Sequence, residues 1–171
     1  MGKISITGPE SSGKTTLAIE LAKIFSFTYV PEYSREFLLR GGKVLSGRDL
    51  VSIAKYQIES ENRALLDSTT IICDSDMLVL KIWNQEKFLP LHPALNALYK
   101  YHHYDYTLLC APDIKWEADS LRENPNDRER LFDLYKWNLQ KRHIHFDTIM
   151  GQGSARSELA KDFITRYLEM G

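Results

Sequence analysis

The sequence predicts an α/β fold with a five-stranded parallel sheet and helices on both faces. Short runs of apolar and β-branched residues alternate with longer stretches of helical periodicity, the pattern of strands joined by helical crossovers. The runs are brief and mostly apolar, as strands covered on both faces should be. With 171 residues, 43% of them hydrophobic and 26% charged, the chain suits one ordinary domain, so we expect a single domain over residues 1–171.

Five segments are expected to form the strands of this sheet. They are, in chain order, Lys3–Thr7, Phe27–Val30, Thr70–Asp74, Tyr106–Ala111 and His143–Ile149. Two of these segments contain the cysteines of the chain, Cys73 and Cys110. We expect both to be buried free thiols, as is usual in a reducing compartment.

Apolar stripes at helical spacing predict the helices between the strands. The first helix directly follows the first strand. A long helix begins at Ser46, and Asp49 stands three residues on, in a pattern that resembles a capping box. Two further helices begin near Asn126 and Ser154. The charged, weakly periodic stretch between the fourth strand and the helix near Asn126 is expected to be a loop that moves.

The strongest motif is GPESSGKT at residues 8–15, a full match to the phosphate-binding pattern G-x-x-x-x-G-K-[ST] between a strand and a helix. Gly8 and Gly13 permit a backbone conformation and a close approach that a Cβ would block. Lys14 would lie between the β- and γ-phosphates, and the Thr15 hydroxyl would bind Mg²⁺. The sequence therefore predicts a P-loop NTPase that binds a nucleoside triphosphate with Mg²⁺, rather than a Gly/Ser-rich surface turn. The motif leaves the choice between ATP and GTP open, and ATP is the nucleotide that we expect. The predicted nucleotide-binding residues are Gly8, Glu10, Ser11, Ser12, Gly13, Lys14, Thr15 and Thr16.

An acid follows the second strand, at the edge of the sheet where ligands bind in open α/β folds. Glu32 could accept a proton there from an attacking hydroxyl, or it could cap the N-terminus of the next helix. Arg35, about one helical turn on, could hold a phosphate or orient Glu32, or it could pair with a surface acid.

Two acids follow the third strand. Asp74 ends the strand in the manner of a Walker B element and is the better candidate for binding Mg²⁺. Asp76 could instead reach the ribose of an acceptor. Helix capping by either acid is the alternative, and the spacing does not divide the roles between them.

The charged segment is expected to form a mobile lid over residues 112–130. Its arginines, Arg122 and Arg128 ahead of Arg130, could stabilise the charge that develops on a transferred phosphoryl group. The alternative is an ion-paired helix start in which acids such as Asp127 take up the arginines.

The charge balance excludes several classes of function. The 22 Lys and Arg against 23 Asp and Glu give a formal net charge of −1, so no overall field favours nucleic acid or an anionic membrane. No apolar run approaches the roughly 20 residues of a membrane helix, and the N-terminus is too polar for a secretion signal. We therefore expect a cytoplasmic protein. The N-K-x-D signature of GTPases is also absent from the sequence, which favours a small-molecule kinase.

Four segments together resemble the ribosylnicotinamide kinase domain of the NadR family, over nearly the whole chain. They are GPESSGKTTL, VPEYSREFL, CDSDMLVLKIW and YDYTLLCAPDIKWEADSLREN. The resemblance implies transfer of the γ-phosphoryl group of MgATP to nicotinamide riboside, giving nicotinamide mononucleotide in NAD salvage. The sheet order expected for this kinase class is 2-3-1-4-5. No H-x-G-H motif is found, so we expect no adenylyltransferase domain in this chain.

The resemblance and the residue patterns together give one set of expected site residues. The catalytic residues would be Lys14, Glu32, Asp76, Arg122 and Arg128. The residues that bind the nucleoside-like acceptor would be Glu32, Tyr33, Arg35 and Asp76, and the Mg²⁺ ligands would be Thr15 and Asp74. Two alternatives stay open. One is a kinase of another nucleoside or nucleotide, and the other is a nucleotide-dependent regulatory ATPase. The sequence leaves the oligomeric state open.

Overall fold

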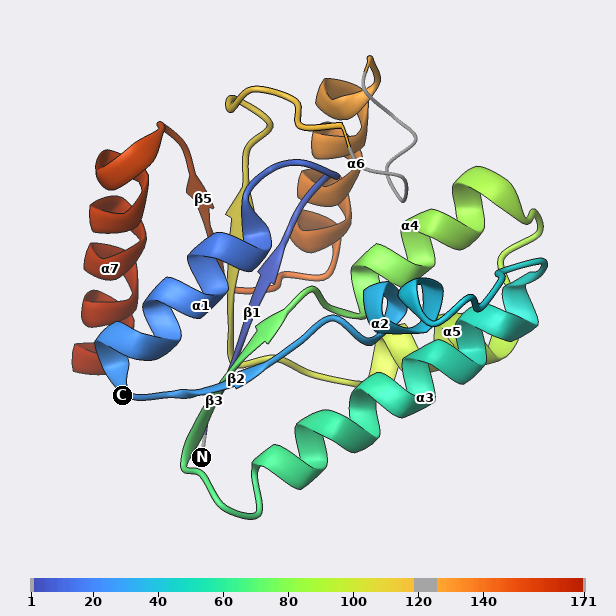
Figure 1. Ribbon diagram of the computed structural model, residues 1–171, viewed down its shortest axis with the longest axis horizontal. Coiled ribbons are helices and arrows are strands. Elements are labelled where there is room, and N and C mark those ends of the chain that lie inside the picture. Colours follow the sequence, from blue (N-terminus) through green and yellow to red (C-terminus); the bar gives the residue numbers. More distant parts are fainter. Residues whose placement is uncertain (1, 119–125, 171) are drawn as a thin grey trace.

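A five-stranded, fully parallel sheet forms the centre of the computed structural model, which describes residues 2–118 and 126–170 (Figure 1). The strand order is β2-β3-β1-β4-β5, which confirms the predicted fold and order. The strands are β1 (Gly2–Thr7), β2 (Thr28–Val30), β3 (Thr70–Asp74), β4 (Tyr106–Cys110) and β5 (Phe146–Ile149).

The strand ends differ from the predicted ends by up to three residues, most at β5. The strand was predicted from His143 but begins at Phe146. His143 adopts a left-handed φ of 53°, and its amide donates to the Gln140 carbonyl at 3.0 Å. Residues 143–145 therefore lie in the segment that ends the preceding helix, and only Phe146–Ile149 of the predicted strand pair with β4.

The helices cover both faces of the sheet (Figure 1). They are α1 (Lys14–Phe25), α2 (Tyr33–Leu39), α3 (Gly47–Ala64), α4 (Met77–Lys87), α5 (Pro93–Tyr101), α6 (Arg128–Lys141) and α7 (Gly153–Met170). The side chains of α1 and α7 form one buried core with β1 and β4. Those of α3, α4, α5 and α6 form a larger core on the other face. Burial of these two apolar layers is the main force that holds the helices to the sheet.

Two local details differ from the expectations. Helix α5 was not predicted, although Pro93 at its first position and His92 as its N-cap are ordinary start signals. Only the acidic half of the capping box at α3 forms. Asp49 Oδ2 accepts from the Leu45 amide at 2.9 Å and from Ser46 Oγ at 3.0 Å, so the serine hydroxyl is used as a donor and does not cap the helix.

The predicted lid of residues 112–130 is described in part. Residues 112–118 form an irregular segment after β4, and Arg128–Arg130 form the first turn of α6. Arg122 lies outside the described residues. Cys73 and Cys110 are free and buried, as expected. No helix within residues 2–118 and 126–170 is long and apolar enough to cross a membrane.

Candidate active site

The phosphate-binding loop connects β1 to α1 at the carboxyl edge of the sheet. Gly8 has a φ of 137°, and a Cβ built on it would lie 2.6 Å from the backbone oxygen of Cys110. Gly13, with a left-handed φ of 77°, stands directly before α1. Only glycine adopts both conformations at low cost, so the loop can pass close to β4 and end at the N-terminus of α1. Amides at such a helix start attract phosphate.

The side chain of Lys14 folds back over the phosphate-binding loop. Its ammonium donates to the backbone oxygens of Gly8 at 3.0 Å and Pro9 at 2.8 Å. Ser12 Oγ also donates to the Pro9 oxygen, at 2.8 Å. Thr15, the next residue of α1, is exposed, so its hydroxyl is accessible to a ligand. The loop therefore holds a positive charge and an accessible hydroxyl at the edge of the sheet.

Glu32 follows β2 and is half-buried. Burial raises the pKa of its carboxyl, while the nearby Lys14 ammonium and the Ser34 hydroxyl oppose the rise. Ser34 Oγ donates to Glu32 Oε1 at 2.5 Å. Asp74 also raises this pKa and Arg35 lowers it, both through their charges. The fold thus brings four residues proposed from sequence close enough to interact electrostatically. Glu32 holds the N-cap position of α2, yet its side chain makes no capping bond to the described amides.

Asp74 ends β3 and is 2% exposed. Tyr29 OH donates to Asp74 Oδ2 at 3.1 Å, and burial, with a further contribution from this carboxylate, raises the pKa of the tyrosine. Asp74 Oδ1 is buried and has no hydrogen-bond partner among the described residues. A buried carboxylate oxygen left in this state costs free energy unless a ligand reaches it.

Asp76 serves as the N-cap of α4. Its Oδ1 accepts hydrogen bonds from the amides of Leu78 at 3.0 Å and Val79 at 3.2 Å, and from Thr7 Oγ1 at 2.9 Å. Burial raises the pKa of Asp76 to about 6, against the opposing effect of these donors. Of the two acids that could cap a helix, Asp76 therefore does so, whereas Asp74 caps no helix among the described residues.

Thr15 and Asp74 fit a magnesium ion, which prefers hard oxygen ligands. The fit rests on the unpartnered Oδ1 of Asp74 and the exposed hydroxyl of Thr15. Within the described part of the chain, no group of three or more His, Cys, Asp and Glu side chains could hold a metal by itself. Mg²⁺ is commonly bound through one or two protein oxygens together with substrate phosphates, so such a group is not needed here.

The two described arginines of the predicted lid have different partners. Arg128 Nη1 donates to the backbone oxygens of Ser11 at 3.1 Å and Ile114 at 3.0 Å. Arg130 is an exposed residue that pairs with Asp127 and Glu86, both at 2.5 Å. Arg128 therefore contacts the phosphate-binding loop. Arg130 instead forms ion pairs at the start of α6, which was the alternative to a role in the lid.

A pocket lies beside Glu32, between α2, α3 and the start of α4. It is lined by Glu32, Ser34, Ile53, Gln57, Ser75, Asp76, Val79 and Leu80. Ser75 has a left-handed φ of 77°, and its buried Oγ has no hydrogen-bond partner among the described residues. Polar side chains such as Glu32 and Ser75 thus line this small pocket together with the apolar side chains of Ile53, Val79 and Leu80.

A family model described as "AAA domain" matches residues 3–156. The chain belongs to this AAA domain family. The curated protein NadR of Escherichia coli, a trifunctional NAD biosynthesis and regulator protein, is 29% identical over 150 residues. That alignment covers 84% of this chain and 37% of NadR, so the AAA domain described here spans well under half the length of this relative.

Solved structures share the fold of this AAA domain. NadR in complex with NR matches with a TM-score of 0.84 and 19% identity, over 97% of this chain and 51% of that one. NadR with NAD and AMP-PNP matches with a TM-score of 0.78 and 19% identity, over 97% and 49%. Thymidylate kinase from Ehrlichia chaffeensis matches with a TM-score of 0.68 and 16% identity, over 95% and 98%. The AAA domain thus has the fold of a P-loop kinase of the NadR type.

One residue that contacts the phosphate-binding loop was missed by sequence reasoning. Arg156 in α7 is 6% exposed, and its Nη2 donates to the backbone oxygens of Ser12 at 2.8 Å and Ala111 at 3.1 Å. Its Nη1 donates to Asp113 Oδ1 at 2.9 Å. A signal was available, because Arg156 stands four residues before Ala160, which belongs to the buried stripe of α7.

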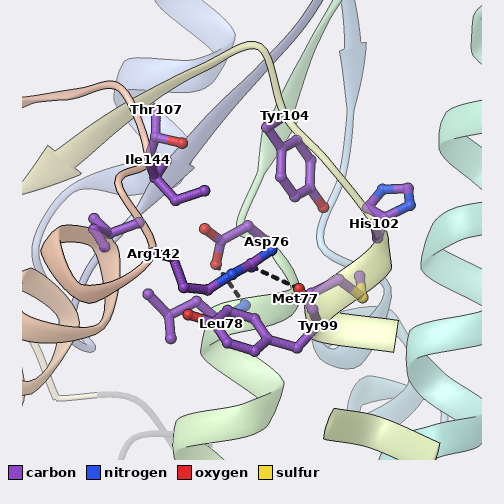
Figure 2. Close-up of a pocket in the computed structure, with 10 residues that line it drawn as sticks. Asp76, Met77, Leu78, Tyr99, His102, Tyr104, Thr107, Arg142 and Ile144 are labelled. Atoms are coloured by element: carbon purple, nitrogen blue, oxygen red, sulfur yellow. Dashed lines mark hydrogen bonds between the residues drawn. The ribbon is translucent and has the colours of Figure 1, made fainter. Parts of the chain in front are cut away.

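A second pocket of the AAA domain lies on the far side of Asp76, under β4. Figure 2 shows Asp76 between Arg142 from the end of α6 and Tyr104 from the segment before β4. Arg142 Nη1 donates to the backbone oxygen of Tyr99 at 2.7 Å and so closes the end of α5. Asp76 therefore lines both pockets.

Proposed function

We propose that the chain is a small-molecule kinase that transfers the γ-phosphoryl group of ATP to the primary hydroxyl of a nucleoside-like acceptor. Nicotinamide riboside is the acceptor that we propose first, with nicotinamide mononucleotide as the product. The observation that carries the proposal is the phosphate-binding loop at the carboxyl edge of the sheet, beside the buried Asp74 Oδ1 that has no hydrogen-bond partner among the described residues, with Glu32 at the end of the next strand. The similarity to NadR, whose structure has been solved with NR, supports this choice of acceptor.

In phosphoryl transfer, the protein contributes mainly by positioning the two substrates and by placing charges that stabilise the transferred group. In our proposal, Lys14 and the amides at the start of α1 hold the phosphates of ATP. The acceptor oxygen forms a bond to the γ-phosphorus while the bond from that phosphorus to the β–γ bridging oxygen breaks, and ADP leaves. Mg²⁺, when bound at Thr15 and Asp74, would supply positive charge against the phosphate oxygens.

Glu32 would accept the proton of the attacking hydroxyl. Burial raises its pKa and so makes the carboxylate a stronger base, while Lys14 opposes the rise and favours the ionised form. Arg128 would hold the phosphate-binding loop to the segment after β4 through Ser11 and Ile114. For Arg122, the role over the transferred phosphate stays a prediction.

A kinase of another nucleoside or nucleotide is the second candidate. It is favoured by the likeness in fold to thymidylate kinase, at a TM-score of 0.68. The test is ADP release from MgATP with and without nicotinamide riboside, followed by identification of the product by mass. Strong stimulation and addition of one phosphate to the riboside would support the first candidate. Stimulation by another member of a nucleoside panel would support the second, and slow release that no acceptor stimulates would indicate a regulatory ATPase.

Glu32→Gln tests the assignment of the base. The amide cannot take up the proton, so we expect the rate of acceptor phosphorylation to fall by about 10²- to 10⁴-fold, with nucleotide binding retained. Glu36→Gln is the matched control, because Glu36 lies one turn further along α2 and pairs with Arg40 at the surface. Equal rates for the Glu32 and Glu36 variants would remove Glu32 from the mechanism.

A further inference from the structure

The first turn of α2 is stabilised by a side chain from another helix. The Tyr33 amide, at the first position of α2, donates to Gln57 Oε1 of α3 at 2.8 Å. Amides in the first turn of a helix have no partner within the helix, and a side chain usually supplies one. Gln57 thus binds the amide of the residue that directly follows Glu32, and the side chains of Gln57 and Glu32 line the same pocket.

The orientation of the Gln57 side chain is fixed by its second partner. Gln57 Nε2 donates to Glu61 Oε1 at 3.3 Å, one turn further along α3. A backbone amide only donates, so the oxygen of Gln57 must face the Tyr33 amide, and its nitrogen then faces Glu61. Gln57 is 5% exposed, which leaves its amide little freedom to turn toward water.

Glu61 is in turn held from the segment between α5 and β4. His102 Nε2 lies 2.6 Å from Glu61 Oε2, and Tyr104 OH donates to Glu61 Oε1 at 2.9 Å. Glu61 is fully buried. Figure 2 shows His102 and Tyr104 on this segment, beside the start of α4. The contacts form one continuous path from the segment before β4, through α3, to the residue next to Glu32.

We propose, on the basis of the kinase function proposed above, that Gln57 is a positioning residue for the base Glu32. It acts through the backbone of Tyr33 and sets the direction in which α2 leaves β2. The chain supplies three charged neighbours for the Glu32 carboxyl, Lys14, Asp74 and Arg35, and Gln57 fixes the distance of that carboxyl from them. A displacement of about 1 Å at such a group can cost about 100-fold in rate.

Gln57→Leu removes both hydrogen bonds and nearly keeps the size of the side chain. We expect kcat to fall by about 10- to 100-fold, with the KM for ATP changed by less than about 3-fold, because the nucleotide contacts lie on another loop. Asn84→Leu is the matched control. Asn84 is a fully buried amide that also supports a loop, through Phe88 and His92, away from Glu32. We expect it to lower stability and to leave kcat nearly unchanged.

A second measurement does not depend on activity. The carboxyl carbon of Glu32, assigned by its loss in Glu32→Gln, is titrated by NMR in the wild-type chain and in both leucine variants. We expect the titration midpoint of Glu32 to move in Gln57→Leu and to stay in Asn84→Leu. If Gln57→Leu does not fold, Gln57→Ala is titrated instead.

The two measurements separate the positioning role from the kinase function. An unmoved midpoint in the Gln57 variant overturns the positioning role, even where the wild-type chain is an active kinase. A moved midpoint in a chain that phosphorylates no acceptor supports the contact and refutes the kinase function on its own. A fall in kcat that Asn84→Leu reproduces would show general destabilisation and would also overturn the positioning role.

Discussion

Two carboxylates near the sheet edge, Glu32 and Asp76, have raised pKa values, and they differ in what their oxygens contact. Asp76 Oδ1 already receives three donors, two amides of α4 and the Thr7 hydroxyl. Glu32 receives the Ser34 hydroxyl and lies near Lys14. At the scale of single residues, Asp76 therefore holds the start of α4 against β1, whereas the Glu32 carboxyl makes no capping bond to the described amides.

Asp76→Asn should change how stability depends on pH. The folded pKa of about 6 lies above the ordinary value of 3.8, so the folded state holds a proton that the unfolded state has released. The stability from this proton is present at low pH and is lost as pH rises through about 6. Asparagine keeps the capping oxygen and cannot ionise. The free energy of unfolding of the variant, relative to that of the wild type, should therefore rise by about 1 kcal/mol as the pH increases from about 5 to about 8.

Urea unfolding of both chains at the two pH values measures this difference. Asp67→Asn, at an exposed position, is the control and should track the wild type. A gap between the wild type and Asp76→Asn that is the same at both pH values would contradict the buried, capping role of the ionisable group.

At the scale of elements, the side chain of Arg156 ties α7 to the phosphate-binding loop. Arg156 links α7 to Ser12 of the loop, to Ala111 after β4 and, through Nη1, to the Gly151 oxygen at 3.0 Å. Three segments far apart in sequence therefore depend on one guanidinium group. Its planar fork of donors cannot be reproduced by an ammonium.

Arg156→Lys should weaken nucleotide binding and lower stability. Carbonyl oxygens left without a partner cost about 1–3 kcal/mol, and the loop loses the contact at Ser12 that fixes it. We expect the KM for ATP to rise by about 10-fold and the free energy of unfolding to fall by about 1–3 kcal/mol. Arg166→Lys, at an exposed position of the same helix, serves as the comparison and should change neither quantity. An unchanged KM in Arg156→Lys would show that the contact with Ser12 is not needed by the loop.

Local signals predicted the strands and several helices, but α5 was missed although Pro93 and His92 mark its start. The strands and the phosphate-binding loop follow from apolar runs and one motif, whereas the strand order was expected from the kinase class that the chain resembles. The structure confirms the strands and their order. The division of roles between Asp74 and Asp76 could not be predicted, since it depends on whether Thr7 and the α4 amides reach one of them. Gln57 gave no local signal, because its partner Tyr33 belongs to another helix.

At the scale of the whole molecule, the parallel sheet gathers the site at one edge. The loops after β1, β2 and β3 carry Lys14, Glu32 and Asp76, and β3 itself ends in Asp74. These four groups come from three separate parts of the chain, so they lie together only in the folded state. A ligand that binds there must stabilise the whole fold.

MgATP should therefore raise the melting temperature. At a concentration 100 times its dissociation constant, a ligand that binds only the folded state adds about 2.7 kcal/mol. The gain should disappear in Lys14→Met and shrink when EDTA removes Mg²⁺ or when Asp74→Asn removes the unpartnered oxygen. Lys23→Met, at an exposed position of α1, is the control and should retain the full gain. A gain that EDTA leaves intact would remove Asp74 and Thr15 as metal ligands.

The two thiols have a consequence for how this fold can be observed. Cys73 and Cys110 lie on β3 and β4, the strands on either side of β1, and burial raises the pKa of both. Only the thiolate is reactive, and neither sulfur meets water in the closed sheet. Alkylation must wait until the strands separate. The rate of cysteine labelling therefore reports how often the central sheet opens. A nucleotide that binds at the edge of the sheet should slow this rate without contacting either cysteine side chain.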